Sequence, residues 1–223
     1  MERHVWTGRT RLRLGVELYT RLPVVALGDG EVTTAEGRVA ARCVVVATNA
    51  FTRELLRGFP IEPYQSQVTV TDDVEDRTGG RIVTSEDGPV YFNQPRGGLR
   101  DGRAPLVFGG GDDRPLDDPR SRVRSVEVHG QLVELRDRYF PELHGREPSA
   151  EWIGPMGFTP DQLPAIGHLR DGVVVAAGFN GYGGSYTTAA GEAAAATAAS
   201  GAVPHWVDAK VFASARLVAR DSY

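Results

Sequence analysis

The sequence is poor in cysteine and lysine, and each shortage excludes a class of site. Cys43 is the single cysteine among 223 residues, so no disulfide can form within the chain. Lys210 is the single lysine, and the Gly-Lys-Ser/Thr triplet of a P-loop does not occur. The five histidines lack the spacing of metal ligands. We therefore predict no metal site, no P-loop and no internal disulfide.

Charge and hydropathy remove further classes of protein. The formal net charge is −4, which argues against general binding of nucleic acid. No apolar run is long enough to cross a bilayer, and residues 1–13 are too polar for the apolar part of a signal peptide. The G-x-S-x-G pattern of serine hydrolases does not occur. We expect a cytoplasmic protein with neither a nucleic-acid nor a membrane partner.

The order of patterns along the chain predicts an interrupted α/β domain. Residues 43–47 form a short run rich in valine, which is typical of a strand covered on both faces in a parallel sheet. Short strands separated by glycine and proline turns fill residues 65–109 and favour an antiparallel or mixed sheet. Apolar residues at helical spacing follow in 128–139. The predicted division is 1–60, 61–150 and 151–223.

The strongest local signal lies at residues 173–199. An apolar strand leads into the glycine-rich turn GFNGYGG, and an alanine-rich helix follows. Glycines permit close approach of the backbone, and the N–H groups and dipole at a helix start favour an electron-rich atom. The alternative is a tight turn packed on the core without a ligand.

Three segments in this order resemble a known family. They are ARCVVVATNA at 41–50, EWIGPMGFTPDQLPAIG at 151–167 and VVAAGFNGYGGSYTTAAG at 174–191. They are similar to the C-terminal part of FAD-dependent oxidoreductases of the D-amino-acid oxidase superfamily, in the branch of glycine oxidase, sarcosine oxidase and related amine oxidoreductases. KVFASARL at 210–217 is similar to that family's closing F-x-x-x-R segment.

The resemblance implies a fold and an activity. The fold would be a partial FAD-binding, Rossmann-like α/β domain interrupted by a mixed or antiparallel substrate-binding sheet. The activity would be oxidation of a C–N bond in an amine or amino acid, with hydride transfer to the flavin. The family's motifs place the cofactor against Ala47, Thr48, Asn49, Gly178, Asn180, Gly181, Tyr182 and Gly183. No catalytic residue is identified.

Departures from the family pattern concern the substrate and the attachment of the flavin. Sarcosine-oxidase-like members attach FAD through a cysteine near the position of Pro155. The single cysteine of this sequence, Cys43, lies elsewhere, so we expect FAD to bind non-covalently. Neither the arginine found near Met156 in glycine-oxidase-like members nor the lysine found near Ser185 in sarcosine-oxidase-like members is present. A carboxylate in an enclosed site needs such a partner, which favours an amine or a larger substrate. Tyr91, Met156 and Ser185 are the predicted pocket residues.

The largest departure is the dinucleotide-binding motif. The family's G-x-G-x-x-G turn and the acidic residue that follows it do not occur in this sequence. We therefore expect a truncated chain that binds FAD poorly and turns over little on its own. The alternatives are one half of a split flavoenzyme, whose partner chain supplies the dinucleotide-binding half, or an inactive remnant.

Overall fold

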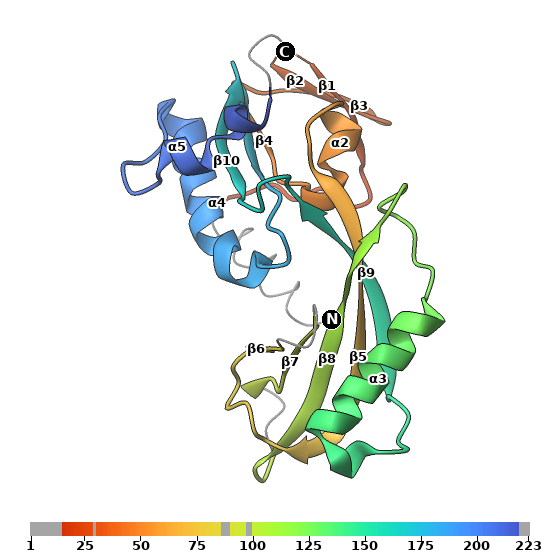
Figure 1. The fold of residues 1–223 in the computed structure, drawn as a ribbon. Helices are drawn as coiled ribbons and strands as arrows, with labels where there is room; N and C mark the ends of the chain where they lie inside the picture. The colour runs from red at the N-terminus through yellow and green to blue at the C-terminus, as the bar shows by residue number, and fades with distance from the viewer. Residues whose placement is uncertain (1–14, 29, 86–89, 97–99, 219–223) are drawn as a thin grey trace.

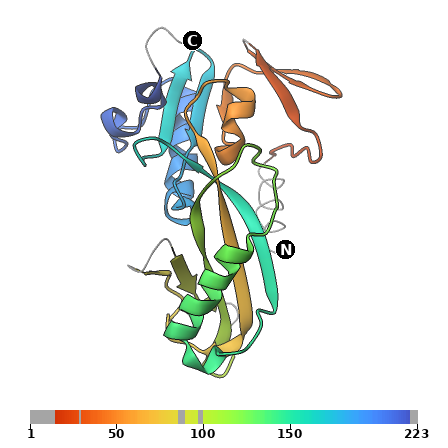
Figure 2. The same cartoon turned by 45° about the vertical axis from the view of Figure 1, so that its right-hand side comes forward.

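The computed structural model describes residues 15–28, 30–85, 90–96 and 100–218. Two lobes lie one above the other in Figure 1, and the long strands β5 and β9 run from one into the other. The chain enters the lower lobe through β5 (Glu62–Glu75) and returns through β9 (Ala150–Phe158). Figure 2 shows the same division after a turn of the molecule.

The upper lobe is built on a small mixed sheet. Its strand order is β10-β11-β4, with β4 (Val44–Val46) parallel to β11 (Val173–Ala177) and β10 (Ala165–Arg170) antiparallel to β11. Helix α4 (Gly183–Ser200) packs on this sheet through buried alanines, whose small side chains allow close approach. The expected parallel pairing of the valine-rich strand is confirmed. The expectation that both faces of this strand are buried is wrong. Strand β4 lies at the end of the sheet, and its Val45 is 40% exposed.

The lower lobe is a five-stranded antiparallel sheet of order β6-β7-β8-β5-β9. Its remaining strands are β6 (Val83–Thr84), β7 (Val90–Asn93) and β8 (Arg103–Pro115). Helix α3 (Val126–Tyr139), capped by the Ser125 side chain, packs its buried Val128 and Leu132 against one face of the sheet. The predicted boundary at residue 150 falls at the start of β9, which is still a strand of this sheet.

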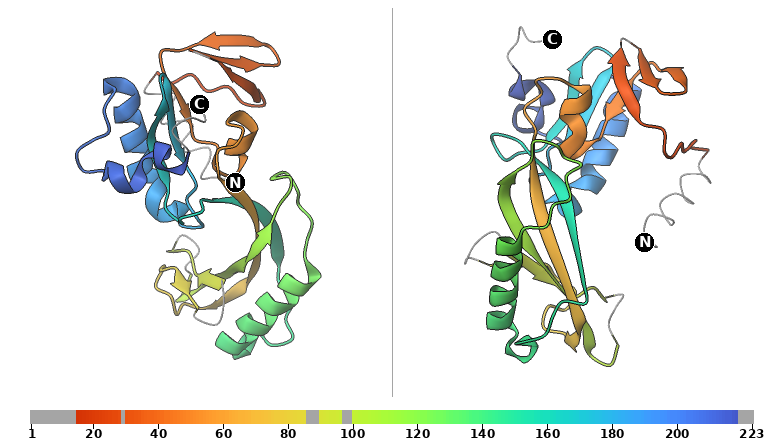
Figure 3. Two further views of the ribbon diagram at one scale, coloured as in Figure 1. Left: turned by 45° about the horizontal axis from the view of Figure 1, so that its top comes forward. Right: turned by 90° about the vertical axis from the view of Figure 1, so that its right-hand side faces the viewer.

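Smaller elements complete the described chain. The strands β1 (Val24–Gly28), β2 (Glu31–Thr34) and β3 (Gly37–Ala40) form a separate antiparallel sheet beside the upper lobe (Figure 3). The short helices are η1 (Asn49–Phe51), α2 (Thr52–Leu55), η3 (Pro141–Leu143), α5 (Ala209–Phe212) and η4 (Ser214–Leu217). Among the described residues, no helix is long and apolar enough to cross a membrane.

The mixed α/β architecture confirms the predicted fold class. Helix α3 contains the predicted 128–139 segment, and α4 contains the alanine-rich run. Helix α4 begins at Gly183, six residues before that run. Its first turn therefore includes Gly183 and Gly184 despite their low helix propensity.

Candidate functional site

Two segments far apart in sequence meet where β4 and β11 end. Val46 pairs with Val175 in the parallel ladder, so both strands end at the same edge of the sheet. Just beyond, the Asn49 side-chain oxygen accepts hydrogen bonds from the backbone N–H of Gly178 at 3.0 Å and of Phe179 at 3.3 Å. The structure thus joins the two halves of the predicted cofactor set. In open α/β sheets, ligands bind at the carboxyl ends of the strands.

Asn180 ties the same turn to the end of β9. Its Oδ1 accepts from the Thr159 N–H at 2.8 Å, and its Nδ2 donates to the Gly178 carbonyl at 2.6 Å. Its backbone N–H donates to the Gly157 carbonyl at 3.0 Å. Because Asn180 is only 5% exposed, we assign its side chain to holding the turn and not to contacting a ligand.

The glycines around the turn fall into two kinds. A Cβ on Gly178, whose φ is +73°, would lie 2.5 Å from Thr159 Cγ2, so packing and backbone conformation both require glycine. A Cβ on Gly181 would meet only Met156 Sδ, at 3.8 Å, and one on Gly184 would meet nothing within 4 Å. Gly178 therefore serves the packing of the turn, whereas Gly181 and Gly184 leave the backbone open to approach.

The start of α4 borders this open side. Tyr182 is the N-cap residue, its side chain makes no capping hydrogen bond, and the first turn holds no acidic residue. The uncapped N–H groups and the dipole of this 18-residue helix favour negative charge beside them. The side chains of Tyr182 and Ser185 are exposed at this end, with Tyr182 63% exposed.

The remaining cofactor candidates lie on the opposite side of the junction. Ala47 is exposed directly after β4. Thr48 is half-buried, and its hydroxyl lies 3.2 Å from the Thr52 hydroxyl at the start of α2. Thr48 thus connects the end of the strand to the helix that follows.

Two of the predicted pocket residues, Tyr91 and Met156, lie on strands of the lower sheet, and the structure brings only Met156 to the turn. Met156 on β9 lies beside Gly181. Tyr91 lies on β7, separated from β9 by β8 and β5, and its ring lies across the backbone of Gly109. Ladder pairing and the two-residue alternation place Tyr91 and Met156 on the same face of the sheet, opposite α3, but not in contact.

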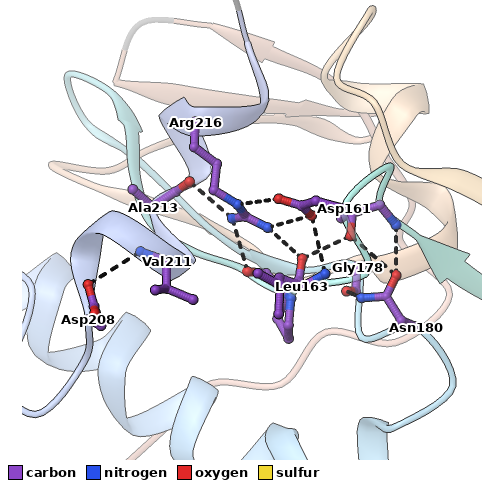
Figure 4. Close-up of polar contacts among 10 residues, drawn as sticks. Asp161, Leu163, Gly178, Asn180, Asp208, Val211, Ala213 and Arg216 are labelled. Carbon is purple, nitrogen blue, oxygen red and sulfur yellow. Dashed lines mark hydrogen bonds and ion pairs between the residues drawn. The ribbon is translucent and has the colours of Figure 1, made fainter.

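An ion pair that the sequence analysis did not identify fixes the loop after β9 (Figure 4). Arg216 on η4 donates to the two carboxylate oxygens of Asp161 at 2.7 and 2.9 Å. It also donates to the carbonyls of Leu163 at 2.6 Å and Pro164 at 3.1 Å. The hydrogen bond from Arg216 lowers the pKa of Asp161. The family's F-x-x-x-R tail was the one sequence signal for this arginine, and it did not indicate the partner.

Comparison with known proteins identifies the family. The sequence profile of the FAD-dependent oxidoreductases matches residues 5–197. The chain belongs to this family. The predicted family resemblance and the FAD-dependent class are therefore confirmed.

Individual relatives are distant and longer. Glycine oxidase from Pseudomonas putida is 28% identical over 166 residues, which cover 65% of this chain and 41% of that protein. Gamma-glutamylputrescine oxidoreductase from Escherichia coli is 26% identical over 167 residues, covering 72% and 37%. L-proline dehydrogenase from P. horikoshii superposes with a TM-score of 0.76 at 23% identity over 94% of this chain and 57% of that one. The chain spans about two fifths of the length of these curated relatives.

As a member of an FAD-dependent family, the chain offers residues that fit part of this cofactor. The open glycines of the turn, the uncapped start of α4 and the end of β4 lie around one edge of the sheet. Backbone N–H groups there suit the electron-rich end of a flavin ring. The roles of the individual residues toward FAD stay predictions.

Proposed function

We propose that this chain forms the flavin-ring side of an FAD-dependent enzyme that oxidises a C–N bond of an amine or amino acid. The observation that carries the proposal is the junction of Asn49 with Gly178 at the ends of two parallel strands. The names of the two curated relatives, an oxidase of glycine and an oxidoreductase of a putrescine derivative, support this class of substrate.

The chain's own groups have distinct tasks in this proposal. The backbone N–H groups of Gly181, Gly183 and Gly184 bind the electron-rich edge of the ring, because their neighbours in the turn already donate within the chain, and Cys43 forms no covalent bond to it. When bound, FAD supplies the hydride acceptor. Met156 contributes an uncharged wall beside the turn, which favours an amine or larger substrate over a small amino acid with an unshielded carboxylate.

The proposal also limits what this chain does alone. The pyrophosphate and adenosine of FAD need donors that the glycine-rich turn of a dinucleotide-binding unit provides, and no G-x-G-x-x-G motif occurs here. We propose that residues 1–223 by themselves bind FAD weakly and turn over slowly.

Titration of FAD by quenching of flavin fluorescence tests the assigned site. Gly184 and Gly191 both lie in α4 with open space around them, but only Gly184 borders the turn. We expect Gly184→Leu to weaken FAD binding by roughly tenfold or more, because the side chain would occupy the approach to the turn, and Gly191→Leu to leave it unchanged. Equal affinity of both variants and the wild type would refute the placement. Bleaching of the flavin band by an amine under anaerobic conditions then tests the reaction.

A further inference from the structure

One row of residues crosses four strands on the face of the lower sheet opposite α3. Tyr91 on β7 pairs with Gly109 on β8, which in turn pairs with Val68 on β5. Val68 also pairs with Trp152 on β9. Residues that are directly paired project their side chains to the same face. The left view of Figure 3 shows α3 on the convex side of this curved sheet, so the row lies on its concave side.

The two aromatic residues of the row lie on either side of Val68. The Tyr91 ring lies across the backbone of Gly109, where a Cβ would be 2.6 Å from its hydroxyl oxygen, so the ring leans toward β5. Trp152 lies beyond Val68 on the edge strand β9 and is 49% exposed, whereas Val68 is 4% exposed. Trp152 is therefore the accessible part of this row.

The same face of β9 connects Trp152 to the turn after β11. Trp152, Gly154 and Met156 alternate along the strand and so point to one face. Met156 lies beside Gly181 of the turn, and a Cβ on Gly154 would meet nothing within 4 Å. Because each strand residue advances about 3.4 Å, Trp152 lies about 14 Å from Met156 along β9. The face therefore has an open stretch at Gly154, between the proposed flavin site and an exposed aromatic ring.

The side chains along this stretch are suited to an uncharged group. From the row of Met156 to that of Trp152, the residues that β5 and β9 place on this face are uncharged: Tyr64, Ser66, Val68, Trp152, Gly154 and Met156. Glu151 alternates with Trp152 and so points to the opposite face, where Arg124 donates to it at 2.7 Å. A charged group would lose hydration here without gaining a partner, whereas an aromatic ring can stack on the indole.

We infer that Trp152 is a specificity-determining residue of the proposed amine oxidation, and that it binds an aromatic group at the far end of the substrate. This inference rests on the proposed function. The substrate class is an amine whose reacting C–N bond lies at the turn and whose uncharged tail carries the aromatic group about 7 to 14 Å away. Because Trp152 lies far from the reacting atoms, it contributes to the affinity for the substrate and not to the rate of flavin reduction at saturation.

Anaerobic bleaching of the flavin band against amine concentration, in the FAD-saturated chain, tests the inference. The probes are 6-phenylhexylamine, whose six-carbon linker spans roughly 7 Å, and n-hexylamine, which lacks the ring. We expect the wild type to bind the phenyl compound more tightly. Trp152→Leu should reduce this preference by about fivefold, and Trp152→Phe, which keeps an aromatic ring, should retain most of it. The limiting rate of bleaching should be the same in all three proteins.

Trp206→Leu is the matched control. Trp206 is 47% exposed, close to the value for Trp152, but it lies between α4 and α5 in the upper lobe. We expect this variant to keep the full preference for the phenyl compound. If both amines bleach the flavin and Trp152→Leu keeps the wild-type preference, the inference is overturned and the proposed function stands.

Tryptophan emission gives a readout that does not depend on turnover. 6-Phenylhexylamine should shift the emission of the wild type and of Trp206→Phe to shorter wavelength, because it removes the Trp152 ring from water, and should not shift that of Trp152→Phe. No shift in the wild type, or an equal shift in Trp152→Phe, would overturn the inference. A shift that follows protein concentration without amine would also overturn it, because Trp152 would then lie between two copies of the chain. A shift without bleaching by either amine would contradict the proposed function and leave the site of the aromatic group standing.

Discussion

Removing the Arg216 guanidinium should destabilise the upper lobe far more than removing an ordinary surface charge. Arg216 donates to the Asp161 carboxylate and to the carbonyls of Leu163, Pro164 and Ala213, and its side chain is 15% exposed. Arg216→Ala leaves these acceptors without their donor, which we expect to cost about 3 kcal/mol of the free energy of unfolding.

Removing the charge of Asp161 should cost less free energy of unfolding than removing Arg216. Comparing the two variants therefore separates the ion pair from the carbonyl contacts of Arg216. The Asp161 side chain is 38% exposed, so its ion pair is screened by water, and Asp161→Asn leaves Arg216 bonded to three carbonyls. We expect about 1 kcal/mol for that change. Arg53→Ala is the control, because Arg53 and Glu62 form an ion pair in which both side chains are about half exposed; its expected cost is about 0.5 kcal/mol or less.

Urea unfolding followed by tryptophan fluorescence and circular dichroism at neutral pH measures all three differences. The reasoning is refuted if Arg216→Ala costs no more than Arg53→Ala. It is also refuted if Asp161→Asn costs more than Arg216→Ala, because the carbonyl contacts would then contribute nothing.

Three further expectations follow from the same region. The pKa of Asp161 is lowered in the folded chain by its hydrogen bond from Arg216. The carboxylate therefore stabilises the fold above the ordinary pKa of 3.8, and this contribution is lost as the pH falls through the lowered pKa. In unfolding experiments at acid pH, the stability difference between wild type and Asp161→Asn should vanish. Gly178→Ala should lower the unfolding midpoint, at a cost of about 2 kcal/mol, because of its φ and the contact with Thr159, whereas Gly191→Ala in α4 should raise it; equal shifts would contradict the packing argument. Asn49→Ala should speed amide exchange at Gly178 by about tenfold, and Asn49→Asp, which keeps an acceptor, should not.

Patterns within short stretches of sequence predicted most of the fold. The valine runs at β4 and β11, the turn after β11 and the helices α3 and α4 all follow from local apolar spacing and propensity. The valine-rich composition of β4 predicted a parallel sheet but not its partner strand; the observed pairing with β11 brings Asn49 and Gly178 together.

The parts that sequence could not predict depend on distant contacts. Arg216 and Asp161 are 55 residues apart, and no local pattern pairs one arginine among many with one aspartate. Asn180 lies among predicted cofactor residues, yet the structure directs its side chain to Thr159. The place of Tyr91 depends on strand order, since β8 and β5 separate its strand from β9.

The pairing of β5 with β9 has a consequence for how the chain folds. Glu62 pairs with Phe158, so the lower sheet brings together the two points at which the chain enters and leaves it. Before the sheet forms, 129 residues separate Asn49 from Gly178. Once it has formed, the remaining connection between β4 and β11 consists of the two segments that flank the sheet, residues 47–61 and 159–172, together about 30 residues. The shorter connection lowers the entropic cost of bringing β4 and β11 together by about 1 kcal/mol. We expect the lower sheet to fold first, so that lengthening its outer loops slows the joining of β4 and β11 very little.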